Sequence, residues 1–156
     1  MNRRRRKKLS RHLVDAAMLG HTARAEALLR LGADPGRADR EGTTPLYAAS
    51  VQGDAETVRL ILAAGACPDA ESGHGSEGTP LCAAACWGHT ETVRELLAHG
   101  ADPNLREDHG TGRTPLEWAV ADSHAETDAL LVAAGATHRD APGPGVVTTT
   151  PAPPVP

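Results

Sequence analysis

The side chains best suited to chemistry gather in one short stretch, TPLCAAACWGH. Cys82, Cys86 and His89 there have the spacing C-x3-C-x2-H, and Cys67 and His74 are near in the sequence. Thiolate and imidazole are common zinc ligands, and Cys82 and Cys86 would share one side of a helix. However, no closed set of four ligands has the spacing of a zinc finger or ribbon. We therefore expect Cys82 to fill a half-buried position, and the sequence predicts neither a metal site nor another cofactor.

Catalytic motifs are also missing from the sequence. There is no phosphate-binding glycine loop, no His-Glu-x-x-His and no nucleophile elbow. The eight histidines are scattered along the chain. No pocket-forming architecture is indicated either, and we therefore predict that the protein is not an enzyme.

The composition favours a helical protein of one domain's length. The chain has 156 residues, no Phe, one Tyr and two Trp, while alanine is very frequent. A core of Ala and Leu suits closely packed helices, whereas a β-sandwich or barrel would contain more aromatic and β-branched residues. Three cysteines cannot all pair, which indicates a reducing compartment. With no signal peptide and no membrane span in the sequence, we expect a cytoplasmic protein.

Positive charge is concentrated at the N-terminus. Residues 1–8 carry six basic residues and no acid, whereas the remaining chain has 10 basic and 20 acidic residues. The basic arm consists of Arg3, Arg4, Arg5, Arg6, Lys7 and Lys8. Such a run can bind nucleic acid, an anionic membrane or an acidic protein surface, or it can be a solvated, frayed tail. No aromatic residue is interleaved with it, so base stacking is not indicated.

The same sequence pattern recurs along the chain at a nearly fixed period. Gly-Ala occurs at Gly32, Gly65, Gly100 and Gly135, with spacings of 33, 35 and 35 residues. Thr-Pro precedes three short apolar segments, where Thr can cap a helix and Pro suits its first turn. Leu46, Ala49 and Ser50, then Leu81, Ala84 and Ala85, then Leu116, Ala119 and Val120 would form one face of each first helix. A glycine then predicts a turn.

A second helix follows each of these turns. Glu56, Glu91 and Glu126 fall in its first turn, where a carboxylate suits the helix dipole. Each second helix ends at the glycine of Gly-Ala, a residue suited to a left-handed C-cap. Neither helix is long enough to be stable alone, so the units are predicted to stack.

These motifs resemble those of ankyrin-repeat proteins, in particular small ones of the bacterial type. The matching segments are TPLYAASVQGD…LILAAGACPD, TPLCAAACWGH…ELLAHGADPN and TPLEWAVADSH…LLVAAGAT, with RHLVDAAMLGH…ALLRLGADPG as a first, capping copy. The resemblance implies an all-α solenoid of four helix-turn-helix units joined by short β-hairpin-like loops, at about residues 9–36, 37–69, 70–104 and 105–138. The domain would span residues 9–138.

The sequence departs from the family pattern at three places, and each departure predicts a structural difference. The family's histidine after Thr-Pro-Leu is replaced by Tyr47, Cys82 and Glu117, which puts its loop hydrogen bonds in doubt. Ser123 replaces the glycine between the last two helices, which predicts a looser final turn. The loops at residues 71–78 and 105–113 are longer than that at residues 38–43, and we expect them to be more mobile. We call these three loops the fingers.

Helical geometry locates the outward face of the first helices. At about 100° per residue, with Leu81 at 0°, Trp87 falls near 240°, away from its own core. The equivalent positions of all units form a stripe, which we call the docking stripe: Met18, Leu19, Val51, Gln52, Cys86, Trp87, Ala121 and Asp122. An exposed aromatic residue with apolar neighbours is typical of an interaction hot spot, so Trp87 is a predicted anchor. Alternatively, Trp87 lies flat over the helix end and covers a neighbouring repeat.

Partners of ankyrin-like proteins usually dock on the finger tips and on the concave face of the first helices. The resemblance therefore implies a module that binds another protein of unknown identity through this face, and we expect it to be a monomer. Because the binding energy would come from desolvating Trp87, Val51 and Met18, we expect the affinity to depend little on salt. The finger candidates, which mix both signs of charge, are Arg40, Glu41, His74, Glu77, Asp108, His109 and Arg113. The alternative function is a nucleic-acid or anionic-surface tether through the basic arm, with the repeats as a scaffold.

The C-terminal segment has a different composition. Six prolines occur between Asp140 and the end of the chain, which excludes regular helix and favours extended conformations. The Pro-x-x-Pro at residues 151–154 is a weak ligand motif. We predict a disordered Pro/Thr-rich tail at residues 139–156.

Overall fold

Helices begin at each of the three Thr-Pro motifs in the computed structural model, which describes residues 3–138. Proline occupies the first turn of each helix, where a backbone N–H would have no acceptor within the helix, so the missing N–H of proline costs no hydrogen bond. The threonine hydroxyl accepts a hydrogen bond from the backbone three residues on: Thr44 from Tyr47 at 3.3 Å, Thr79 from Cys82 at 3.2 Å and Thr114 from Glu117 at 3.2 Å. The predicted caps are thus confirmed.

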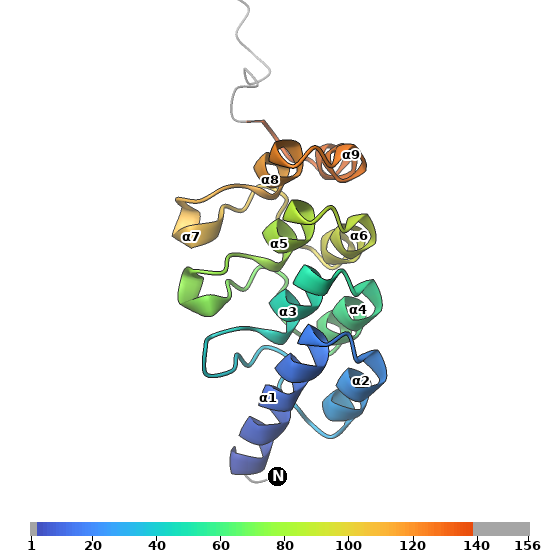
Figure 1. Cartoon of the computed structure of the whole chain (residues 1–156), viewed down its shortest axis with the longest axis vertical. Coiled ribbons are helices and arrows are strands. Elements are labelled where there is room, and N and C mark those ends of the chain that lie inside the picture. The colour runs from blue at the N-terminus through green and yellow to red at the C-terminus, as the bar shows by residue number, and fades with distance from the viewer. Residues whose placement is uncertain (1–2, 139–156) are drawn as a thin grey trace, which may run out of the picture.

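The helices lie in antiparallel pairs that stack along one axis (Figure 1). The pairs are α1 (Arg3–Met18) with α2 (Thr22–Arg30), α3 (Pro45–Gln52) with α4 (Ala55–Ala63), α5 (Pro80–Cys86) with α6 (Thr90–Ala98), and α8 (Pro115–Ala121) with α9 (Ala125–Ala133). The 3-10 turn η1 (Gly73–Gly75) and the short helix α7 (Glu107–Gly110) lie in the second and third fingers. In Figure 1 the fingers project from one side of the first helices and the second helices lie on the other. The all-α stack predicted from the sequence is confirmed.

Each second helix ends at a Gly-Ala pair, as expected. Gly32, Gly65, Gly100 and Gly135 have φ between 86° and 98°. The N–H of the following alanine reaches back five residues to a carbonyl of the last turn, as from Ala101 to Leu96 at 3.0 Å. The four alanines are buried. This geometry satisfies carbonyl groups that a helix end would otherwise leave unpaired.

The last inter-helix turn is not looser than the others, contrary to the expectation from Ser123. Ser123 has φ 61°, close to the values of 70° for Gly53 and 67° for Gly88. The hydrogen bond that closes this turn, from His124 N–H to the Ala119 carbonyl, is 2.9 Å long. The backbone bonds of the turn therefore hold serine in the left-handed conformation at some cost in strain.

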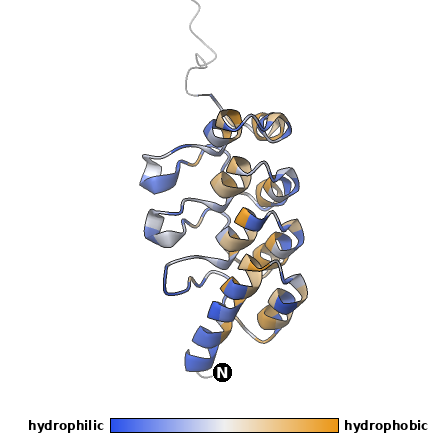
Figure 2. Ribbon diagram, viewed as in Figure 1, coloured by the Kyte–Doolittle hydropathy of each residue, from blue (hydrophilic) through white to orange (hydrophobic). Residues whose placement is uncertain are grey.

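The core consists mainly of small and branched aliphatic residues between adjacent pairs. Leu46, Leu81 and Leu116 of the first helices are nearly inaccessible, as are Val58 and Val93 of the second helices. Figure 2 shows hydrophobic colour concentrated where the helices face one another. Val120, expected on the inner face, is 49% exposed because, within residues 3–138, no further helix pair packs on α8.

Helix α1 includes the basic residues predicted to form a separate arm. It begins at Arg3 and continues without interruption to Met18, so residue 8 is not a helix boundary. The N-terminal half of α1 is strongly hydrophilic in Figure 2 and extends past the end of the stack. The predicted tail at residues 139–156 lies outside the described residues. Within residues 3–138, no helix is both long and apolar enough to cross a membrane.

Candidate functional site

Cys82, Cys86 and His89 have partners in different parts of the structure. The buried Cys82 thiol donates to the Arg113 carbonyl at 3.6 Å, and the Cys86 thiol donates to the Asp122 carboxylate at 3.6 Å. His89 bonds instead to the preceding repeat. Burial raises the pKa of Cys82 to about 12, which suits a buried side chain rather than a thiolate ligand. No group of three or more candidate metal-ligating side chains occurs in residues 3–138.

His89 joins neighbouring repeats through a hydrogen bond to a helix end. Its Nε2 donates to the Val51 carbonyl at 3.1 Å, because a carbonyl can only accept. His124 repeats the arrangement one unit later, with Nε2 at 2.9 Å from the Cys86 carbonyl. Each imidazole packs against the glycine of the preceding turn: a Cβ on Gly53 would lie 2.6 Å from His89 Nδ1. These histidines are therefore structural ties.

Asp54 occupies the position of these histidines in its own repeat. Its carboxylate caps α4 by accepting from the Thr57 N–H at 3.0 Å and from the Thr57 hydroxyl at 2.6 Å. It also accepts from the Thr22 hydroxyl of α2 at 2.9 Å. Partial burial acts to raise the pKa of Asp54, but these hydrogen bonds outweigh it and lower the pKa. Folding therefore favours the ionised carboxylate.

The docking stripe is exposed at the positions expected to carry binding. Trp87 is 61% exposed, while Met18 and Leu19 are 47% and 63% exposed. Val51 and Cys86 are partly buried, and the polar members Gln52 and Asp122 are exposed. The first helices α1, α3, α5 and α8 are consecutive neighbours in the stack. The stripe thus runs across all four pairs, with its largest side chain in the third.

The first and second fingers are joined by hydrogen bonds. The Gly73 N–H donates to the Gly42 carbonyl at 2.9 Å. The Glu77 carboxylate accepts from the Thr43 hydroxyl of the first finger at 2.8 Å and from the Ser72 hydroxyl at 2.7 Å. Glu77, a predicted contact residue, therefore fixes the relative position of two fingers.

The second and third fingers are joined through Glu71. One carboxylate oxygen accepts from the His109 N–H at 2.9 Å and the other lies 2.8 Å from His109 Nδ1. His109 and Asp108 have positive φ in α7, and His74 has the same conformation in η1. The additional residues of these fingers thus form compact turns. Of the predicted finger contacts, Arg40, Glu41, His74, Asp108, His109 and Arg113 are exposed.

Trp118, which the sequence places between the third and fourth repeats, bonds to the third finger. Its indole N–H donates to Glu107 at 2.7 Å, and the Arg113 guanidinium lies 4.4 Å from its ring centroid. Burial raises the pKa of Glu107 although the bond from Trp118 acts in the opposite direction. The available signal was an aromatic residue at the position of Ala48 and Ala83.

Glu117 replaces the family's histidine with a different set of bonds. It completes a capping box by accepting from the Thr114 N–H at 3.0 Å, and it pairs with Arg106 at 2.7 Å. The ion pair is about three-quarters buried on both sides. The third finger is therefore attached to α8 by charge-assisted bonds.

Two comparisons with known proteins bear on this arrangement. Residues 13–107 and 68–140 match the family model described as ankyrin repeats (3 copies). Together the two matches cover most of the chain. No curated protein matches the sequence.

Proposed function

Because this chain belongs to the ankyrin-repeat family, we propose that it is a non-enzymatic module that binds another protein through the docking stripe and the fingers. Ankyrin repeats are generally protein–protein interaction modules, and no catalytic family matches. We propose four repeats, at residues 9–36, 37–69, 70–104 and 105–138, in a monomeric cytoplasmic protein. The observation that carries the proposal is the exposure of Trp87 in a stripe that also contains Met18 and Val51.

Trp87 supports the proposal through its position and its environment. A tryptophan that is 61% exposed gains little from folding and exposes a large apolar surface to water. Covering it with a partner removes that surface from water, which is the main source of binding energy at hot spots. The alternative role of Trp87, covering a neighbouring repeat, requires a buried ring.

The fingers support the proposal through their mutual attachment. The bonds of Glu77 and Glu71 hold three consecutive fingers in fixed relation. A surface fixed before binding loses less conformational entropy when a partner docks. We propose that Arg40, Glu41 and His74, at the tips, contribute specificity rather than most of the affinity.

A matched pair of variants tests this function. The full chain is used to capture partners from the source cell, bound proteins are identified, and their affinities are measured with purified components. Trp87→Ala should weaken binding by about 2 kcal/mol or more, about thirtyfold in Kd. The control is Leu31→Ala, because Leu31 is 54% exposed at the end of α2, away from the stripe. It should leave Kd unchanged.

Two outcomes would contradict the proposal. One is a partner whose affinity is the same for the wild type and for Trp87→Ala, with both proteins folded by circular dichroism. The other is an affinity that falls steeply with added salt, because burial of apolar surface depends little on ionic strength.

A further inference from the structure

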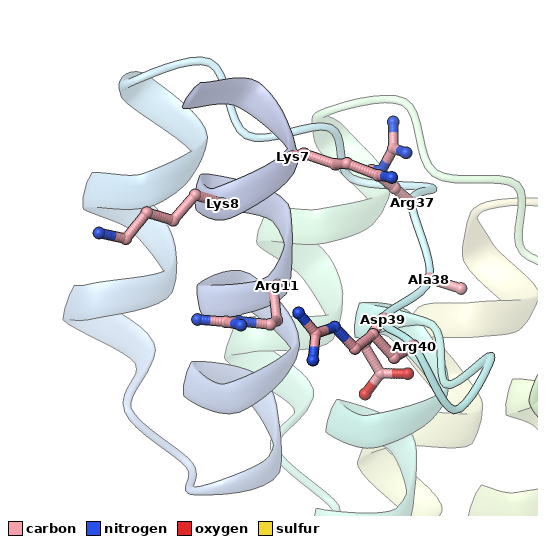
Figure 3. Close-up of a pocket in the computed structure, with 7 residues that line it drawn as sticks. All are labelled: Lys7, Lys8, Arg11, Arg37, Ala38, Asp39 and Arg40. Atoms are coloured by element: carbon pink, nitrogen blue, oxygen red, sulfur yellow. The ribbon is translucent and has the colours of Figure 1, made fainter. Parts of the chain in front are cut away.

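A cleft of about 510 Å³ lies between the N-terminal half of α1 and the loop that follows α2 (Figure 3). Its volume is within the range of about 300–1,000 Å³ typical of ligand sites. The lining residues are Lys7, Lys8, Arg11, Arg37, Ala38, Asp39 and Arg40. Five of these seven are cationic and one is acidic. The cleft is separate from the docking stripe, whose nearest member, Met18, is at the other end of α1.

The cations that line the cleft belong to two elements. Lys7 and Arg11 are four residues apart on α1 and therefore on one face of the helix. Arg37 and Arg40 belong to the loop opposite. In Figure 3, Lys7 extends toward Arg37, and Arg40 lies beside Asp39 on the loop. The side chains of Lys8 and Arg11 point away from the loop in this view, although both line the cleft. An anion in the cleft would be held from both sides.

Within the part of the chain that the structure describes, four of these cations have no ion-pair partner. They are Lys7, Arg11, Arg37 and Arg40. Asp39, the one acid of the cleft, uses an oxygen to accept from the N–H groups of Glu41 at 3.0 Å and Thr43 at 2.9 Å. Its carboxylate thus shapes the first finger. By contrast, Arg6 on the same helix is paired with Asp34 at 3.3 Å.

The N-terminal half of α1 carries charges of the unfavourable sign. No acidic residue occurs in its first turn, and cations follow one another from Arg4 to Lys8. Positive charges near a helix N-terminus oppose the helix dipole, and like charges four residues apart repel. A bound anion would relieve both effects.

We propose that this cleft binds a short acidic segment of a partner protein. Carboxylates suit the planar donors of arginine, and the cleft contains two arginines on the loop and one on α1. The proposal stands independently of the docking stripe.

The charge distribution favours a short segment over an extended polyanion. The first 40 residues contain 11 basic and 4 acidic residues, whereas residues 41–156 contain 5 basic and 16 acidic residues. A nucleic acid that crossed the stack would be repelled by this second part. The cleft also contains no aromatic side chain on which a base could stack. A short acidic segment confined to the cleft would be attracted by the basic residues there and would not reach the acidic part of the stack.

The test measures the affinity of the full chain for fluorescein-labelled hexaglutamate by fluorescence anisotropy. The double variant Arg11→Gln/Arg37→Gln should weaken binding about tenfold. Its control, Arg24→Gln/Arg59→Gln, makes the same change in net charge at two exposed helical arginines outside the cleft, and should weaken binding less than about twofold. Arg11→Lys/Arg37→Lys keeps the charge but removes the planar donors, so it should weaken binding by about threefold, less than the double glutamine variant of the cleft. Trp87→Ala should bind the probe like the wild type, so this test and that of the docking stripe fail separately.

Three results would overturn the proposal. The first is an equal loss of affinity in the two glutamine variants, which would indicate attraction by net charge alone. The second is tighter binding of a single-stranded oligonucleotide, or of phosphatidylserine vesicles, than of hexaglutamate. The third is self-association in sedimentation that the cleft variant abolishes, because the occupant would then be the acidic surface of a second copy.

Discussion

Replacing Gly88 by alanine should destabilise the stack more than replacing Gly100, although both glycines have positive φ. The φ values are 67° and 86°, so alanine is strained at either position. A Cβ on Gly100 has no atom within 4 Å apart from its chain neighbours. A Cβ on Gly88 would lie 2.5 Å from Nδ1 of His124. The difference between the variants therefore isolates the contact with the imidazole.

The expected magnitudes follow from these contacts. The left-handed conformation of alanine costs about 1 kcal/mol at either site. At Gly88, the His124 ring must also move, which breaks its 2.9 Å bond to the Cys86 carbonyl. That carbonyl is in the last turn of α5, so it has no partner within the helix. Losing this bond adds about 1 kcal/mol, so that Gly88→Ala costs about 2 kcal/mol in all.

Urea unfolding followed by circular dichroism measures both variants and a double-mutant cycle with His124→Ala. In the His124→Ala background the imidazole is gone, so Gly88→Ala should cost only about 1 kcal/mol, as Gly100→Ala does. Equal destabilisation by the two glycine variants would refute the reasoning, as would a cost of Gly88→Ala that does not change when His124 is removed.

Three further results are expected. Ser123→Gly should raise the free energy of unfolding by about 1 kcal/mol in the same urea assay, because Ser123 has φ 61°. Folding lowers the pKa of Asp54, so the ionised carboxylate stabilises the folded protein at pH values above the pKa that Asp54 has in the unfolded chain. This stabilisation is lost as the pH falls through the pKa of Asp54 in the folded protein. In acid titrations monitored by circular dichroism, Asp54→Asn should therefore lose less stability than the wild type below about pH 4. Iodoacetamide at mildly alkaline pH should label the exposed Cys67 and not Cys82, whose pKa burial raises to about 12, and mass spectrometry of peptides from folded and urea-unfolded protein checks this.

The helix boundaries were predictable because their causes are local. Thr79 and Pro80 act within one turn of α5, and Gly100 sets the end of α6 through its own conformation. The outward direction of Trp87 followed from helical periodicity alone. Ser123 was misjudged because its conformation is imposed by hydrogen bonds of the turn rather than by its own preference.

The bonds between repeats were not predictable because they join residues more than 30 positions apart. Glu77 with Thr43 is one such pair, and Glu71 with His109 is another. The basic cleft is a similar case. In the sequence, the run of cations indicates a separate basic arm. Only the fold shows that Arg11 lies opposite the loop after α2. The four-residue spacing of like charges on α1 was the one local sign of a basic helical face.

Three of the inter-helix turns are tied by hydrogen bonds to the helix pair that precedes them. His124 bonds to α5, His89 bonds to α3, and Asp54 accepts from Thr22 of α2, so each repeat reaches back to the one before it. Residues synthesised first leave the ribosome first. Each helix pair that emerges therefore finds its hydrogen-bonding partner already in place, and the stack can be completed in the order of translation without waiting for the end of the chain.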